Sequence, residues 1–230
     1  MNEFVQSSAM FGVFLSLLAY EIGALLQRKT KKAFFNPLLV AIILVIGFLV
    51  MFDVEYTSYY ESGKLLGYLL TPATVCLAIP LYEKVQLLKE NWKAIIGGIA
   101  TGTITSLLTI AGIAVLLKLN HMQYVTLLPK SITTAIGLGI CEELGGYGTI
   151  TVAVIVITGI IGNVCAEWIC KVFHINSPIA KGVAIGTSAH ALGTARAMEM
   201  GKIEGAMSSL SIVVAGMMTV ALAPLFAGLL

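Results

Sequence analysis

The sequence predicts an all-α polytopic membrane protein. Three observations predict this: 58% of the 230 residues are hydrophobic, only 11% are charged, and several uncharged tracts are long enough to cross a bilayer. Soluble domains carry about 25% charged residues. Because so few charges cannot cover a water-facing surface, the chain is expected to form a single integral membrane domain over residues 1–230.

The number of membrane segments follows from the length of the apolar stretches. A helix needs about 20 apolar residues to cross the hydrocarbon core. Six stretches meet this length, and two shorter segments, rich in Gly, Thr and Ser, are typical of half-helices or broken helices. We therefore expect six to eight transmembrane segments, including discontinuous or re-entrant helices. The six stretches are residues 4–27, 33–52, 65–82, 94–117, 147–170 and 205–230, and the two shorter segments are 131–146 and 182–200.

The orientation follows from basic residues in short loops, because cytoplasmic loops hold the excess of Lys and Arg. Residues 27–32 contain four positive residues and no acid, whereas residues 53–64 contain three acids and one Lys. The first loop is therefore expected in the cytoplasm and the N-terminus outside. The lysines of residues 83–93, together with Lys171 and Lys181, are expected on the inner side.

Polar residues within apolar stretches are functional candidates, since they are expensive at membrane depth. Asn36 lies early in the second stretch, and Thr71-Pro72-Ala73-Thr74 lies in the middle of the third. Pro72 should kink or break its helix, because it removes a backbone N–H and clashes with the preceding turn. Freed backbone groups beside these hydroxyls would form a polar spot. The alternative is a structural kink, with Thr71 and Thr74 bonded to their own helix.

A third polar cluster is centred on Lys130. Pro129 fits just before a helix start, and Ser131 fits the N-cap position, so free backbone N–H groups would lie beside a positive charge. Thr133 and Thr134 add two hydroxyls. This combination indicates an anion site. The alternative is a Lys130 that extends to the membrane interface from an ordinary helix end.

A fourth cluster is a polar stripe in residues 182–197. The spacing i, i+3 and i+7 places its three central residues on one helix face. Ser188 and His190 are two apart and do not face each other, so a Ser-His dyad is not expected. The open alternatives are a packing role for His190 and an Arg196–Glu199 pair. The stripe consists of Thr187, His190 and Thr194, with Ser188 and Arg196 beside it.

No motif in the sequence supports catalysis. There is no HExxH, GxSxG, P-loop or dinucleotide fingerprint. The only adjacent acids, Glu142 and Glu143, would diverge by about 100° on a helix. The four cysteines form no CxxC pair, and the net charge is only +2. We therefore expect no enzyme, no cofactor, no metal, no disulfide framework and no nucleic-acid partner.

Four motifs occur in order along the chain. They are Asn36-Pro37-Leu38-Leu39, the Thr71-Pro72 stretch within residues 70–82, Pro129-Lys130-Ser131-Ile132-Thr133-Thr134, and residues 186–197 around Ser188-Ala189-His190. Together they resemble the LrgB/CidB family of bacterial membrane proteins over nearly the whole chain. Two positions depart from the pattern: Ala135 stands where relatives typically have Pro, and Ala191 where Gly is common.

The resemblance implies a secondary transporter or facilitator of small monocarboxylates, such as pyruvate, glycolate or glycerate, in the bacterial cytoplasmic (inner) membrane. The family includes a domain of the chloroplast glycolate/glycerate translocator. An alternative implied function is an antiholin-like regulator of murein hydrolase activity and cell lysis that acts through oligomeric assembly. The implied partners are a small carboxylate, the lipid bilayer, a small LrgA/CidA-type membrane protein and further copies of the chain.

A carboxylate site needs a cation or helix N-termini to replace lost hydration. Lys130 and Arg196 keep their charge at neutral pH, whereas His190 is a candidate for carrying a coupled proton. The order of segments also indicates an inverted repeat, with halves of about 33–118 and 127–230. We expect the candidate substrate-binding residues to converge on one cavity near the midplane. They are Asn36, Thr71, Pro72, Thr74, Lys130, Ser131, Thr133, Thr134, Thr187, Ser188, His190, Thr194 and Arg196.

Overall fold

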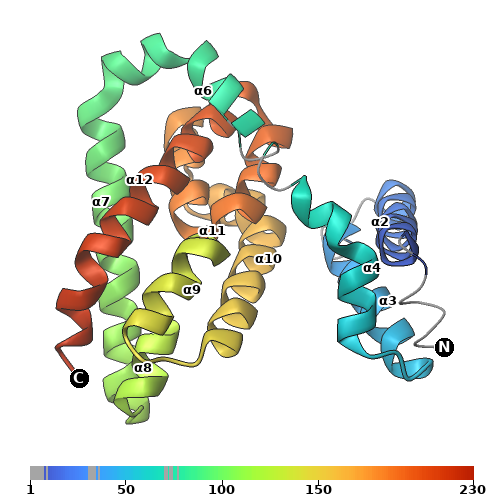
Figure 1. Ribbon diagram of the computed structural model, residues 1–230. Coiled ribbons are helices and arrows are strands. Elements are labelled where there is room, and N and C mark those ends of the chain that lie inside the picture. Colours follow the sequence, from blue (N-terminus) through green and yellow to red (C-terminus); the bar gives the residue numbers. More distant parts are fainter. Residues whose placement is uncertain are drawn as a thin grey trace. The chain divides into compact units, whose positions relative to one another are not determined.

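The computed structural model describes residues 8, 10–30, 35, 37–69, 72, 75–76 and 78–230 (Figure 1). Within these residues every regular element is a helix, so the predicted all-α class is confirmed. The chain divides into two compact units, Met1–Cys76 and Leu77–Leu230. We refer to them as unit 1 and unit 2.

Unit 1 contains three described helices, and close approach between two of them depends on a glycine. A Cβ on Gly12 would lie 2.7 Å from the backbone nitrogen of Gly63. The Gly12 N–H donates to Ser62 Oγ at 3.1 Å, which ties the first helix to the third. The helices are α2 (Phe11–Thr30), α3 (Pro37–Met51) and α4 (Tyr56–Tyr68).

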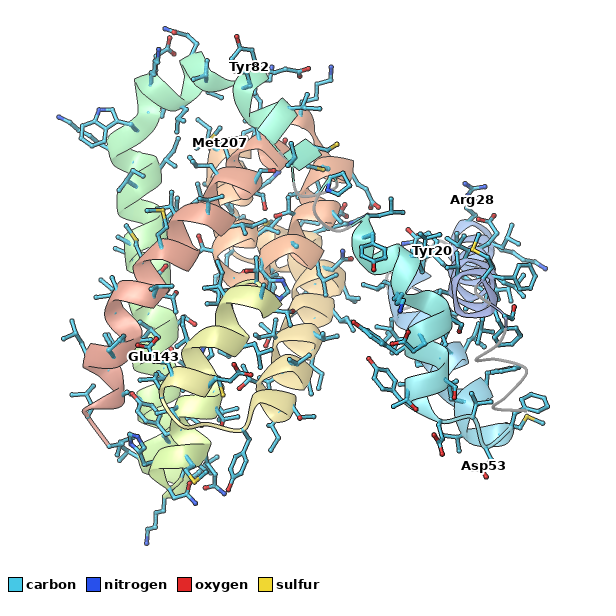
Figure 2. All side chains as sticks on the ribbon, in the orientation of Figure 1. Tyr20, Arg28, Asp53, Tyr82, Glu143 and Met207 are labelled. Atoms are coloured by element: carbon cyan, nitrogen blue, oxygen red, sulfur yellow. The ribbon has the colours of Figure 1, made fainter. Side chains whose placement is uncertain are left out.

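Unit 2 contains the remaining helices. The long helices α7 and α12 lie side by side, while α8 and the C-terminus occupy the same end of the unit (Figure 1). Met207 of α12 is fully buried among the helices of unit 2 (Figure 2). Tyr82, at the end of the unit opposite α8, is 81% exposed (Figure 2). The helices are α6 (Ala78–Glu83), α7 (Val85–Leu117), α8 (His121–Leu127), α9 (Thr134–Glu143), α10 (Gly148–Val172), α11 (Pro178–Met200) and α12 (Lys202–Ala227).

Within the described part of the chain, four helices are long and apolar enough to cross a membrane, namely α2, α7, α10 and α12. The expected stretches at 147–170 and 205–230 closely match α10 and α12. The third expected stretch, 65–82, is not one helix, because α4 ends at Tyr68, within one turn before Pro72, and α6 begins at Ala78. The apolar helix α3 has only 15 residues.

Two segments predicted as loops are largely helical. The expected loop at 83–93 belongs to α7 from Val85 onward, and the expected loop at 53–64 belongs to α4 from Tyr56 onward. Residues 28–30 likewise form the last turn of α2. Hydropathy places the end of a span where the apolar tract ends, but Lys, Gln and Glu are good helix formers and, in residues 85–93, extend the helix beyond the tract. Those loop boundaries were therefore wrong.

Helices α8 and α9 form a short hairpin, which we call the first hairpin, with residues 128–133 at its tip. The hydroxyl of Thr151 on α10 lies 2.8 Å from the Thr126 carbonyl of α8 and 2.9 Å from Cys141 Sγ of α9. One side chain thus contacts both arms. With ten residues, α9 is about 15 Å long, half the thickness of the hydrocarbon core.

Helix α11 also forms a hairpin, because its backbone breaks at His190 (φ 42°, ψ −137°). Ser208 of α12 contacts both arms: its carbonyl oxygen blocks a Cβ on Gly186, and its hydroxyl bonds to Thr194 Oγ1 at 2.7 Å. A Cβ on Gly193 would lie 2.9 Å from Ile185 Cγ2, although residues eight apart on a straight helix are about 12 Å apart. Residues 178–189 and 191–200 therefore lie side by side as the second hairpin.

Candidate functional site

A cavity of about 850 Å³ lies in unit 2 between α7 and the first arm of the second hairpin. It begins between Asn91 and Ser177 and reaches Lys130 and Ser131 at the tip of the first hairpin. Of the predicted site residues, four line this cavity. They are Lys130, Ser131, Thr187 and Ser188.

The α7 wall of the cavity carries a stripe of threonines that the sequence analysis missed. Thr101, Thr105 and Thr109 follow one another at intervals of four residues and so share a helix face. Thr101 Oγ1 donates to the Gly97 carbonyl at 2.9 Å, and Thr109 Oγ1 donates to the Thr105 carbonyl at 2.7 Å. Because these hydroxyls bond within their own helix, α7 stays intact while presenting polar groups. Their regular spacing in an apolar tract was the available sequence signal.

A glycine on α7 lets the second hairpin approach this wall. A Cβ on Gly102 would lie 2.9 Å from Thr187 Cγ2, which is closer than ordinary van der Waals contact. Gly102 therefore permits the close helix packing that small residues allow between membrane helices. The contact places the Thr187 side chain between α7 and α11.

Lys130 supplies the charge at the deep end of the cavity. Its Nζ donates to Ser131 Oγ at 2.9 Å and lies 3.4 Å from Ser106 Oγ, and the two serine hydroxyls are 3.1 Å apart. Among the ion pairs formed by the described residues, none includes Lys130. A half-buried ammonium without a counter-charge is energetically expensive, so this end of the cavity favours an anion.

A second, very small cavity of about 10 Å³ lies beyond Lys130. It is bounded by α7, the first hairpin tip, the second hairpin and α12. Thr103 Oγ1 and Thr187 Oγ1 are buried there, and neither has a hydrogen-bond partner among the residues that the structure describes. An unpaired buried hydroxyl costs about 1–3 kcal/mol, so two of them in one small cavity call for a ligand or water.

His190 lies at the tip of the second hairpin and Thr194 on its second arm, and both are absent from the lining of the larger cavity. His190 is buried, with its Nε2 3.0 Å from the Ile155 carbonyl oxygen of α10. Thr194 Oγ1 donates to the His190 carbonyl at 2.9 Å and also contacts Ser208. The predicted common face for Thr187, His190 and Thr194 is wrong, because the reversal at His190 places Thr187 and Thr194 on different arms.

Arg196 does not lie with Lys130. Its guanidinium forms ion pairs with Glu167 of α10 at 2.6 Å and with Glu199 at 2.5 Å. The open alternative of an Arg196–Glu199 pair is therefore seen, with Glu167 as an additional partner. The expected convergence of Arg196 and Lys130 on one cavity is not found.

The remaining predicted site residues either do not line the cavity or fall outside the described part of the chain. Thr133 is the N-cap of α9 and Thr134 its first residue, and neither lines the larger cavity. Pro72 is exposed. Asn36, Thr71 and Thr74 lie outside the described residues, so the polar spot expected beside Pro72 stays a prediction.

These features define a class of protein: an all-helical, multi-pass membrane protein in which two short hairpins meet beside a cavity that bears a cation. The chain belongs to the LrgB-like family, whose sequence profile matches residues 16–229. The match includes both units and all four motifs, so the predicted family is confirmed. No solved structure matches the chain.

Proposed function

We propose that the protein is a secondary transporter or facilitator of small monocarboxylates, such as pyruvate, glycolate or glycerate. The observation that supports this most strongly is Lys130, a cation with no acidic partner among the described residues at the deep end of an 850 Å³ cavity. Hydroxyls and the Asn91 amide, rather than charges, form the rest of the polar lining. A site with one positive charge and several uncharged polar groups suits a small, singly charged anion.

The proposal includes an orientation in the bacterial cytoplasmic membrane. Asn91 and Ser177 line the cavity together, so the Lys-rich segments around residues 84–93 and 171–181 lie at one end of unit 2. The excess of Lys places that end in the cytoplasm. The cavity then opens inward, and the N-terminus lies outside.

In this orientation both hairpins are re-entrant, the first from the outer side and the second from the inner side. One part of the repeat consists of α7 followed by the first hairpin, and the other consists of α10 followed by the second hairpin. The two parts run through the membrane in opposite directions, as the parts of an inverted repeat do. This pairing differs from the repeat halves that the order of segments indicated. With this pairing, we expect both hairpin tips to lie near the midplane of the membrane, where transporters built from inverted repeats bind their substrates.

Uptake into proteoliposomes tests the proposed function. Radiolabelled pyruvate or glycolate should enter protein-containing vesicles with saturable kinetics, and protein-free vesicles are the control. Measurements with and without a proton gradient would identify proton coupling. Leakage of an entrapped dye without saturable uptake would instead support the antiholin-like regulator, and co-purification with an LrgA/CidA-type protein would identify the proposed partner.

Cysteine labelling tests the orientation. In a background without the four native cysteines, Thr30→Cys and Ser177→Cys should resist an impermeant maleimide in intact cells and react after permeabilisation. Thr57→Cys and Met122→Cys should react in intact cells. This pattern follows from the excess of Lys and Arg beside positions 30 and 177. Labelling of positions 30 and 177 in intact cells, with 57 and 122 spared, would reverse the orientation.

A further inference from the structure

The small cavity beyond Lys130 lies where the two hairpins meet. Ser131 belongs to the tip of the first hairpin, Thr187 to the first arm of the second, and Thr103 to α7. Ser106, Ser131 and Thr187 line both this cavity and the larger one. A ligand that enters the larger cavity can therefore extend polar atoms toward the small one.

Unused hydrogen-bond donors gather around this junction. Lys130 has three N–H donors, of which two face Ser131 and Ser106. Ser106 and Ser131 share one hydrogen bond, which uses one hydroxyl proton and leaves the other free. Thr103 and Thr187 each keep an unused hydroxyl proton. The junction thus offers four donor hydrogens and one positive charge.

A carboxylate complements this set. It carries one negative charge and accepts about four hydrogen bonds through its two oxygens. Thr103 is 3% exposed and Thr187 is 5% exposed, so their hydroxyls are screened from bulk water. A metal cation would also accept hydroxyl ligands, but the ammonium of Lys130 beside the same serines would repel it.

We infer that the junction of Lys130, Ser106, Ser131, Thr103 and Thr187 is the subsite that holds the substrate carboxylate. This inference rests on the proposed function and adds the orientation of the substrate within it. A cavity of about 10 Å³ has room for roughly one water-sized group, so a single carboxylate oxygen reaches Thr103. The rest of the substrate lies in the larger cavity. Lys130 is the only charged residue that the structure places in the lining of these two cavities, and a monocarboxylate therefore fits better than a dicarboxylate.

Thr→Val substitutions test the subsite, because they remove the hydroxyl and nearly keep the shape. Thr103→Val and Thr187→Val should each weaken the binding of pyruvate or glycolate about tenfold or more, measured by calorimetry on the purified full chain. Thr219→Val is the matched control. Thr219 lines the same small cavity, but its hydroxyl already donates to the Ala215 carbonyl at 2.7 Å. The affinity of Thr219→Val for pyruvate or glycolate should therefore stay within about twofold of the wild-type affinity.

Further measurements distinguish a specific loss of binding from a loss of folding in these variants. Thr103→Val removes an unpaired buried hydroxyl and should melt no lower than wild type, while Thr103→Ser should restore binding. Glycolamide, the neutral amide of glycolate, should bind far more weakly than glycolate. Wild-type affinity in both Thr103→Val and Thr187→Val would overturn the subsite, even if uptake is normal. Binding that depends on these threonines without any uptake would support the subsite and reject the transport proposal.

Discussion

Replacing Lys130 by Gln is expected to reduce saturable carboxylate uptake by at least about 30-fold, which corresponds to about 2 kcal/mol or more. Among the described residues that line the larger cavity, Lys130 is the only charged one, and the substitution removes this charge while keeping a side chain that can bond to Ser131. An anion that has left its hydration shell then has no counter-charge. Initial uptake rates in proteoliposomes over a range of substrate concentrations measure the effect.

Arg196→Gln is the matched control, since it makes the same chemical change at a cation with different partners. Arg196 pairs with Glu167 and Glu199, so its loss should lower the melting temperature and change uptake by only a few-fold. The sequence alone made Arg196 and Lys130 equal candidates for the carboxylate. Equal loss of uptake in Arg196→Gln and Lys130→Gln would support the view that both cations bind the carboxylate. Wild-type uptake in Lys130→Gln would remove the main support for a carboxylate site and favour the antiholin-like regulator.

The contrast between Lys130 and its neighbours shows what the sequence could reveal about the site. Lys130 and Ser131 were predictable because charged and polar residues beside Pro129 in an apolar tract form a local signal, although the N-cap of α9 is Thr133 and not Ser131 as expected. Thr103 and Ser106 were missed, because a hydroxyl within an apolar helix usually bonds to its own backbone. Whether Thr103 lacks a partner depends on how α7, the hairpins and α12 pack, and no local pattern records that.

The fold shows the same division between local and tertiary information. Helices α10 and α12 were predictable because a predominantly apolar tract of bilayer length has few other stable forms. A broken helix was expected in residues 182–200 and is seen there, but the reversal at His190 was not predictable, since Ala189-His190-Ala191 contains neither Gly nor Pro and continues a helical pattern. Contacts that become possible only in the folded chain, such as that between the imidazole and the Ile155 carbonyl, accompany the break.

The stabilities of His190→Gly and His190→Ala are expected to reveal this reversal. Both variants lose the imidazole and its contact with Ile155, so that loss cancels in the comparison. At φ 42° and ψ −137° a Cβ is unfavourable, and glycine should be more stable than alanine by about 1–3 kcal/mol. Within a continuous helix the order would be the opposite, with glycine less stable by about 1 kcal/mol. Thermal or denaturant unfolding in detergent measures the difference.

Ala195→Gly provides the reference for ordinary helix within the same element. Ala195 is exposed on the second arm, so its replacement should follow helix propensity and lower stability by about 1 kcal/mol. If His190→Ala proved as stable as His190→Gly or more stable, α11 would be a continuous helix at this position. Ser208 could not then contact both Gly186 and Thr194, because these residues would lie about 12 Å apart along one axis. The order of the two His190 variants therefore decides whether α11 folds back into the second hairpin.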